Sequence, residues 1–183
     1  MLELKKHFLN LENYSTKWEK YFDVYENLLS RYKNKNITFI EIGIFNGGSL
    51  KLWKKYFGEN SRIIGIDINK KCKQFEDKKN NIEVFIGNQS DENFWENFFN
   101  KVGKVDVIID DGGHTNLDQI ITSIKTIPYI NDDGLLIVED THTSYLKNYN
   151  SSMKYSFVNF TKNIIDTLNS NIDLNLDIKK NNN

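Results

Sequence analysis

Acidic and imidazole side chains follow two apolar runs in this sequence. Glu139 and Asp140 come directly after the run LLIV, while Asp110 and Asp111 close the run VDVII, with His114 three residues later. Carboxylate oxygens are the ligands that hard divalent cations prefer, and imidazole exchanges protons near neutral pH. These residue types could therefore form a cation site with an acid–base group beside it, provided that the fold brings the two runs together.

Three more apolar runs end in glycine or polar residues. The run ITFIEI leads into GIFNGGS, RIIGI ends at Asp67, and IEVFI leads into GNQSD. The first loop has the spacing G-x-x-x-G-G, which differs from the G-x-G-x-x-G loop that approaches a pyrophosphate. Asp67 lies one helical connection after Gly43, where a carboxylate can accept hydrogen bonds from both hydroxyls of a ribose. Together these features favour a nucleoside-bearing ligand, with no special provision for phosphates.

The elements that must position these residues alternate between strands and helices. Runs of β-branched and aromatic residues predict five strands, namely ITFIEIGI, RIIGIDI, IEVFIG, VDVIID and LLIVED. Apolar residues at helical spacing predict helices over residues 16–33, 50–57, 94–99, 117–127 and 157–168. The pattern predicts an α/β fold, a Rossmann-like doubly wound and mostly parallel sheet with helices on both faces. Ligands bind beyond the carboxyl ends of such strands, which is where all five polar loops fall.

Composition and charge indicate which partners and which cellular compartment to expect. The 183 residues carry 24 Lys and Arg against 25 Asp and Glu, so charge gives no reason to expect nucleic acid or an acidic membrane as partner. Cys72 is the single cysteine, and the sequence has neither an apolar signal core nor a run long enough to span a bilayer. We expect a cytoplasmic protein with one domain over residues 1–183. Its parts would be a helical segment at 1–35, a cofactor-binding core at 36–142, and a weak edge strand with a disordered tail at 171–183.

Several segments, in order and spacing, resemble the class I S-adenosylmethionine-dependent methyltransferases. They are KWEKYFDVYENLLSRYKNKNITFIEIGIFNGGSLKLWKKYF, IIGIDIN, IEVFIGNQSDENFW, DVIIDDGGHT and GLLIVEDTHTSY, and the similarity covers residues 16–168. More narrowly, they resemble the metal-dependent sugar O-methyltransferases, the branch that includes the mycinamicin, macrocin and novobiocin tailoring enzymes and cephalosporin hydroxylase-like proteins. The resemblance implies Mg²⁺-assisted methyl transfer from S-adenosylmethionine to a sugar hydroxyl of a glycan or a glycosylated metabolite.

The resemblance also implies the cofactor contacts. The acid and glycine loop after the first strand would hold the methionine end, Asp67 the ribose, and the loop after the third strand the adenine. Asn88 stands where family members usually have Asp, and for Asp110 a structural role and a cofactor contact stay equally open. The implied cofactor-binding residues are Glu41, Gly43, Asn46, Gly47, Gly48, Ser49, Asp67, Asn88, Gln89, Ser90 and Asp110.

Asp111, Glu139 and Asp140 match the positions at which the family holds Mg²⁺. Neighbouring parallel strands can bring them together. The ion would lower the pKa of a bound sugar hydroxyl, His114 would take its proton, and the alkoxide would attack the sulfonium methyl. Asp111 and His114 are thus the implied catalytic residues. His142 and Tyr145 are weaker candidates, for the lining of the acceptor pocket, and we interpret the three tryptophans (Trp18, Trp53 and Trp95) as core residues.

The sequence after LLIVED departs from the family pattern. The family's sheet continues with a sixth strand and an antiparallel seventh, whereas here one weakly alternating segment follows at residues 172–178. We therefore expect strands six and seven to be missing or incomplete. The outer edge of the fifth strand would be covered by the C-terminal segment or by another subunit in a homo-oligomer. Two other functions stay open, a truncated and catalytically silent cofactor-binding remnant and, disfavoured by the glycine spacing, an NAD-dependent oxidoreductase.

Overall fold

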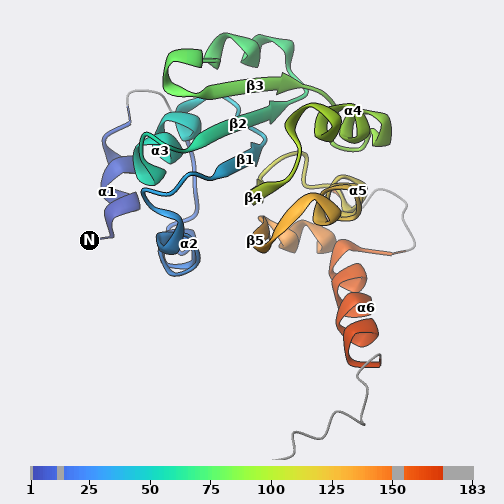
Figure 1. The fold of residues 1–183 in the computed structure, drawn as a ribbon. Coiled ribbons are helices and arrows are strands. Elements are labelled where there is room, and N and C mark those ends of the chain that lie inside the picture. Colours follow the sequence, from blue (N-terminus) through green and yellow to red (C-terminus); the bar gives the residue numbers. More distant parts are fainter. Residues whose placement is uncertain (1, 12–14, 150–154, 171–183) are drawn as a thin grey trace, which may run out of the picture.

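The computed structural model describes residues 2–11, 15–149 and 155–170, and its centre is a five-stranded sheet (Figure 1). The strands are β1 (Thr38–Ile42), β2 (Arg62–Asp67), β3 (Ile82–Ile86), β4 (Val105–Asp110) and β5 (Ile130–Val138). They lie in the order β3-β2-β1-β4-β5, and each neighbouring pair is parallel. The prediction of a doubly wound α/β fold is confirmed, and the strand order reverses between β1 and β4.

Helices cover both faces of the sheet. They are α1 (Glu3–Leu9), α2 (Tyr21–Leu29), α3 (Gly48–Phe57), α4 (Glu92–Val102), α5 (Asn116–Thr126) and α6 (Phe157–Ser170). Short 3-10 turns are η1 (Ser30–Tyr32), η2 (Lys70–Phe75), η3 (Lys78–Asn80), η4 (Ile127–Tyr129) and η5 (Thr141–Tyr145). One apolar cluster joins α1, α2 and α3 to one face, and a second joins α4 to the other.

The two-residue repeat of the strands divides their side chains between these two clusters. Phe39 packs in the cluster of α1 to α3, and its neighbour Ile40 in the cluster of α4. Because successive strand residues face opposite sides, Glu41 follows Phe39 onto the α2 side of the sheet. On β4, Ile108 belongs to the α4 cluster, and Asp110 follows it onto that side. The strand register therefore sends Asp110 away from Glu41.

The N-terminal helix is shorter than the prediction of residues 16–33. Residues 15–18 have no regular structure, and α2 begins only at Tyr21. Trp18 is 62% exposed, so its interpretation as a core residue is wrong, whereas Trp53 and Trp95 are buried as predicted. The side chain of the neighbouring Lys17 is buried instead, because it ion-pairs with acidic residues at the strand ends.

The buried side of α5 is polar, although apolar spacing predicted the helix itself correctly. Leu117, Ile124 and Ile127 are exposed. The buried residues of the helix are Asn116, Gln119, Thr122, Ser123 and Thr126. The Gln119 amide nitrogen donates to the Glu139 carbonyl oxygen at 3.0 Å, which fixes the end of β5 against the helix. This polar packing offers hydrogen bonds to backbone groups that an apolar face would leave unpaired.

A buried hydrogen-bond network holds the loops after β3 and β4 together. The Gln89 amide nitrogen donates to both carboxylate oxygens of Asp110, at 3.0 and 3.2 Å, and to the Thr122 hydroxyl at 3.1 Å. The Gly113 backbone N–H donates to the side-chain oxygen of Gln89 (Oε1) at 2.8 Å. Burial raises the pKa of Asp110 to about 6. These contacts favour a structural role for Asp110 over direct contact with a cofactor.

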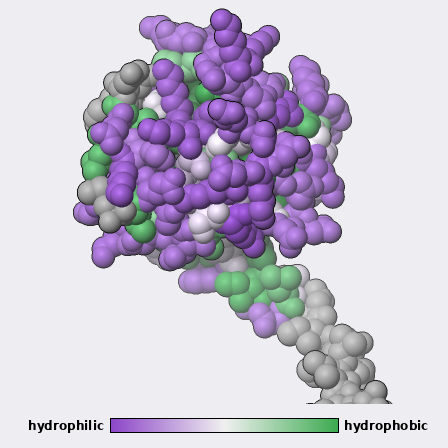
Figure 2. All heavy atoms as spheres, turned by 60° about the vertical axis from the view of Figure 1, so that its left-hand side comes forward, coloured by the Kyte–Doolittle hydropathy of each residue, from purple (hydrophilic) through white to green (hydrophobic). Residues whose placement is uncertain are grey.

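Strand β5 forms one edge of the sheet in the part of the chain that the structure describes. Its residues pair with β4 alone, and its side chains are mostly half-buried. The segment predicted as an edge strand, at 172–178, lies outside the described residues, so its pairing and the homo-oligomer stay predictions. Helix α6 projects from the body in Figure 1, and Figure 2 shows a mainly hydrophilic face with hydrophobic residues gathered near its base. None of the helices within residues 2–11, 15–149 and 155–170 is long and apolar enough to cross a membrane.

Gly43 is required where the end of β1 meets the loop after β4. Its φ is +84°, and an added Cβ would collide with the carbonyl oxygen of Asp111. Gly103 is a matched control, because its φ is +76° but an added Cβ would lie in open space. In both alanine variants the left-handed backbone conformation lowers the free energy of unfolding by about 1–3 kcal/mol. We expect Gly43→Ala to lose a further ~1–3 kcal/mol through overpacking, measured by urea unfolding. Equal losses for the two variants would contradict this contact.

Asp110 should make the free energy of unfolding depend on pH. Its pKa of about 6 lies above the ordinary 3.8, so between these values the folded state binds more protons than the unfolded state. The contribution of Asp110 to the free energy of unfolding is therefore highest below pH 4, and it falls by about 3 kcal/mol as the pH rises through 6.

Asp110→Asn removes this loss, so its stability relative to the wild type should rise between pH 4.5 and pH 7. Urea unfolding at the two pH values, with chelator present, measures the difference. Asp132→Asn, at an exposed position, is the control. A difference between Asp110→Asn and wild type that stays constant with pH would refute the assignment.

Candidate active site

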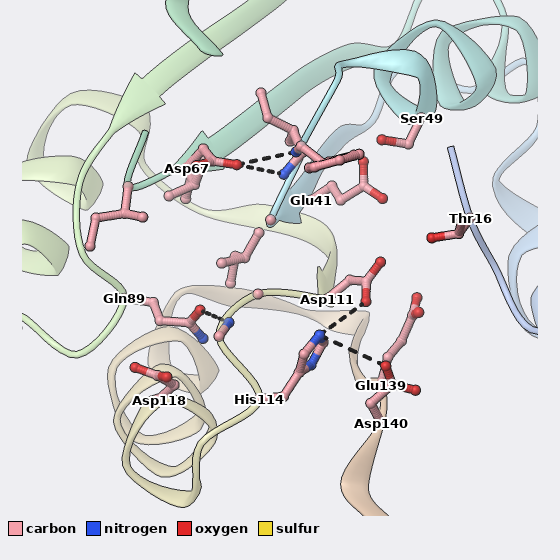
Figure 3. A pocket seen from close by; sticks show the side chains of 18 of the residues that line it. Thr16, Glu41, Ser49, Asp67, Gln89, Asp111, His114, Asp118, Glu139 and Asp140 are labelled. Carbon is pink, nitrogen blue, oxygen red and sulfur yellow. Dashed lines mark hydrogen bonds and ion pairs between the residues drawn. The ribbon is translucent and has the colours of Figure 1, made fainter. Parts of the chain in front are cut away.

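A cavity of about 790 Å³ lies at the carboxyl ends of the strands, where the order reverses (Figure 3). The loops after all five strands line it, and residues 15–19 close one side. Size and position agree with the usual ligand site of a doubly wound sheet. The cavity therefore collects the polar strand ends that the sequence singled out.

Most of the predicted site residues line this cavity. They are Glu41, Gly43, Asn46, Ser49, Asp67, Asn88, Gln89, Asp111, His114, Glu139 and Asp140. Four predicted residues lie outside the lining. Gly47 precedes α3 as its N-cap and Gly48 begins it, Ser90 donates to the Asp118 carboxylate, and Asp110 belongs to the buried network beside Gln89. Whether each of these residues contacts a cofactor stays a prediction.

Asp67 is fixed at the end of β2 by backbone donors. Its Oδ2 accepts hydrogen bonds from the N–H groups of Ile44 and Phe45, at 3.1 and 3.2 Å. Its Oδ1 accepts from the Asn69 N–H at 2.8 Å. The same loop buries Cys72, whose Sγ donates to the Phe45 carbonyl oxygen at 3.3 Å, and burial raises the pKa of this thiol to about 11. The carboxylate of Asp67 thus joins the loops after β1 and β2 and still borders the cavity.

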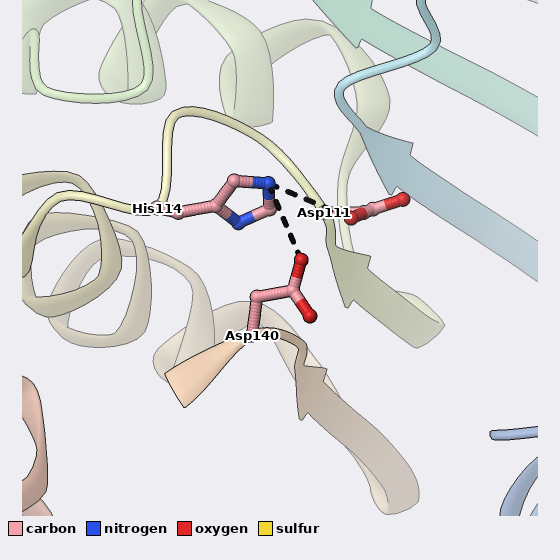
Figure 4. A group of neighbouring side chains, drawn as sticks. All are labelled: Asp111, His114 and Asp140. Carbon is pink, nitrogen blue, oxygen red and sulfur yellow. Dashed lines mark ion pairs between the residues drawn. The ribbon is translucent and has the colours of Figure 1, made fainter. Parts of the chain in front are cut away.

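Asp111, His114 and Asp140 converge at the side of the cavity next to β4 and β5 (Figure 4). The His114 Nε2 lies 3.7 Å from Asp111 Oδ1 and 3.8 Å from Asp140 Oδ2. One donor atom from each residue lies within 4.8 Å of the others, and all three residues are half-buried. His114 Nδ1 is buried without a hydrogen-bond partner. Two carboxylate oxygens at this spacing can hold a divalent cation, with the imidazole nitrogen beside it.

Two of these three residues have a left-handed backbone. His114 has φ +56° and Asp140 has φ +52°, and Phe45, which also lines the cavity, has φ +44°. Such conformations cost about 1–3 kcal/mol each and cluster at functional sites. The hydroxyl oxygen of Thr143 lies 2.8 Å from the His114 carbonyl oxygen and 2.8 Å from that of Asp140, so its single O–H can donate to either and links the two loops.

Glu139, the third predicted metal ligand, lies apart from this cluster. The Lys17 ammonium donates to its two oxygens at 3.1 and 3.3 Å, and the Tyr25 hydroxyl also donates to it. Lys17 donates as well to Asp111 Oδ2 at 2.6 Å and lies 3.3 Å from Glu41 Oε1. The structure thus brings Asp111 and Asp140 together with His114, and Glu139 together with Lys17. A role for Glu139 as a metal ligand stays a prediction.

Burial and ion pairing together set the pKa values of this buried group. The Lys17 side chain is 2% exposed, and burial alone would lower its pKa. The carboxylates of Glu41, Glu139 and Asp111 more than offset this effect, so the pKa of Lys17 is well above its ordinary value. Burial raises the pKa of Glu41, and it raises that of Glu139 to about 7, although Lys17 opposes both shifts. Lys17 is therefore charged.

Sequence reasoning missed the contribution of the N-terminal segment. Lys17 lay inside a predicted helix, and nothing in its spacing to the acidic residues marked it. Tyr21 and Tyr25 were taken only as members of an apolar stripe, yet their hydroxyls donate to Asp140 and Glu139. Trp18 lies edge-to-face with His142, the ring centroids being 6.2 Å apart, at the rim of the cavity. Neither His142 nor Tyr145 lines the cavity itself, so their acceptor role is not supported by the lining.

The cavity is strongly acidic. Among the described residues that line it, carboxylates come from Glu19, Glu41, Asp67, Asp111, Asp118, Glu139 and Asp140, and Lys17 supplies the ammonium. A lining of this charge favours a cationic ligand and disfavours one that carries phosphates. It agrees with the sequence-based expectation of a nucleoside ligand without special provision for phosphates.

Comparison of the sequence with known proteins finds similarity to O-methyltransferases. No family model matches the sequence. The chain is 30% identical over 173 residues to 8-demethyl-8-alpha-L-rhamnosyl tetracenomycin-C 2'-O-methyltransferase of Streptomyces olivaceus, a match that covers 87% of this chain and 44% of that protein. It is 32% identical to demethylmacrocin O-methyltransferase of Streptomyces fradiae, over 66% of this chain and 31% of that protein. The chain thus spans less than half the length of these relatives.

Solved structures agree on the fold. The MycE methyltransferase from the mycinamycin biosynthetic pathway, solved in complex with Mg, SAH and mycinamycin VI, superposes with a TM-score of 0.78. The match has 24% sequence identity and covers 92% of this chain and 48% of that one. The chain thus has the fold of the class I S-adenosylmethionine-dependent methyltransferases, and its sequence is similar to those of the two O-methyltransferases named above.

Proposed function

We propose that the protein transfers a methyl group from S-adenosylmethionine to a sugar hydroxyl of a glycosylated metabolite or glycan, with Mg²⁺ as the assisting cation. The observation that carries the proposal is the convergence of His114 with Asp111 and Asp140 inside an acidic cavity at the reversal of strand order. The relatives named above are O-methyltransferases of rhamnosyl tetracenomycin and demethylmacrocin, which supports a glycosylated acceptor.

The charge of the cavity supports S-adenosylmethionine as the ligand. This cofactor carries a sulfonium, an ammonium and one carboxylate, so its net charge is positive and it has no phosphate, and the described lining is dominated by carboxylates. Asp67 borders the cavity at the end of β2, where its carboxylate would accept hydrogen bonds from the ribose. Gly43 lets the β1 loop approach closely, since a side chain there would collide with the loop after β4.

The donor set also fits a divalent cation. Asp111 and Asp140 would hold it, since each turns one carboxylate oxygen toward the same point beside His114. When bound, the cation lowers the pKa of a hydroxyl and the cofactor supplies the methyl group.

His114 is the group that would take the proton of the acceptor hydroxyl. Its Nε2 borders the point to which Asp111 and Asp140 turn their oxygens, so a hydroxyl held at the cation would lie beside it. Thr143 holds the His114 backbone through the carbonyl oxygen, so the ring keeps its position while the proton moves. Residues 15–19, which include Lys17, close one side of the cavity and limit the access of water to it.

Cofactor binding tests the proposal without any acceptor. We expect titration calorimetry to detect S-adenosylmethionine and not NAD, because the lining is acidic. Asp67→Asn should weaken the binding of S-adenosylmethionine about tenfold or more, because hydrogen bonds to a charged group contribute ~1.5–3 kcal/mol. Asp91→Asn, which alters a helix-capping residue outside the cavity, is the control and should leave the affinity unchanged. Binding of NAD in place of S-adenosylmethionine would overturn the proposed function.

Substitution of His114 separates proton transfer from cofactor binding. We expect His114→Ala to lower the rate of methyl transfer about 10²–10⁴-fold, the usual contribution of a positioned base. Its affinity for S-adenosylmethionine should stay near that of the wild type. His142→Ala, which changes an exposed histidine at the rim, is the matched control. If His114→Ala kept full turnover, or if it abolished cation binding instead, the assignment of His114 as base would fail.

A further inference from the structure

The two carboxylates of the proposed cation site each have one oxygen engaged and one turned to the site. Asp111 Oδ2 accepts from Lys17, while its Oδ1 faces His114. Asp140 Oδ1 accepts from the Tyr21 hydroxyl, while its Oδ2 faces His114 (Figure 4). Both donors come from the same short stretch before and at the start of α2, so a single segment orients both acidic residues.

Tyr21 holds both the backbone and the side chain of Asp140. Its hydroxyl donates to Asp140 Oδ1 at 2.9 Å and accepts from the Asp140 N–H at 3.1 Å. Asp140 has φ +52°, a conformation that costs energy unless contacts impose it. The two hydrogen bonds supply such contacts, and they also select the rotamer that turns Oδ2 toward His114.

Lys17 plays the matching part for Asp111. Its ammonium lies 2.6 Å from Oδ2 of that residue and is itself fixed by Glu41 and Glu139, on β1 and directly after β5. The side chain is 2% exposed, so it has no freedom to leave the group for solvent. The ammonium lies among carboxylates on three sides, and Asp111 is the one that also reaches the cation site.

We propose that Lys17 and Tyr21 are positioning residues for the cation site, which hold Asp111 and Asp140 in place through the oxygens that do not face His114. The inference rests on the proposed cation site. Groups that orient metal ligands in this way change metal affinity by about 10–100-fold when they are removed. The segment before α2 would thus set the affinity for the cation without contacting it.

A competing account makes the opposite prediction for Lys17. If the ammonium occupied the place of the cation, its removal would make the site more negative and would tighten cation binding. If the ammonium positions Asp111, its removal frees that carboxylate to rotate, and binding weakens. The sign of the change in affinity therefore separates the two accounts, and Tyr21→Phe tests positioning without any change of charge.

The experiment measures Mn²⁺ and Mg²⁺ affinity by titration calorimetry on the full chain, without acceptor. Tyr21→Phe and Lys17→Met should each bind the ions about 10–100-fold more weakly than the wild type. Tyr145→Phe and Lys20→Met, at exposed positions, are matched controls and should bind as the wild type does. S-adenosylmethionine affinity and the urea midpoint are measured on every variant, because a role only in folding would move the midpoint.

Each outcome decides the inference. Weaker ion binding at a retained urea midpoint supports positioning by both residues. Unchanged or tighter ion binding in either variant, or a loss that follows the urea midpoint, overturns it. A wild type that binds S-adenosylmethionine but neither ion overturns it together with the cation site, while methyl transfer stands. A wild type that binds the ions but not S-adenosylmethionine overturns the proposed function, and the variants still decide the inference.

Discussion

An ammonium group enclosed by carboxylates organises this molecule at the ends of its strands. Lys17 joins Glu41, Asp111 and Glu139, which belong to β1 and to the loops after β4 and β5. Removing several charges from water is costly unless they compensate one another, so each of these side chains depends on the others. The constraint explains why residues 15–18 leave the helical path and why Trp18 lies outside the core. It also places the tyrosine hydroxyls of α2 against the acidic residues.

Much of the fold could be predicted from the sequence because the strands are buried on both faces. Continuous apolar runs mark such strands, and each run ended where the structure places the cavity. The side chains of Asp111, His114 and Asp140 could be expected to meet, because parallel strands of one sheet deliver their ends to the same edge. The resemblance to the methyltransferases supplied the expected identity of the ligands, which spacing alone would not have given.

Other features depended on contacts that a single sequence does not reveal. The ammonium of Lys17 lies 94 residues away in sequence from Asp111, and no local pattern links the two. Apolar spacing found α5 but assigned it the wrong buried side, since Gln119 and Thr122 make tertiary hydrogen bonds that outweigh the burial of Leu117 and Ile124. The separation of Glu139 from the His114 cluster likewise follows from its contacts with Lys17 and Tyr25 and has no signal in the ED dipeptide.

The burial of Cys72 has a practical consequence. Its thiol is the sole one in the sequence, and it donates to the carbonyl oxygen of Phe45 in the loop that follows β1. Alkylation needs both exposure and the thiolate, so reagent reaches this sulfur only when the surrounding loops separate. The rate at which Cys72 is alkylated therefore measures how often the loops open at the proposed cofactor end of the cavity. Such a measurement would follow the local opening of the loop after β1 without an introduced label.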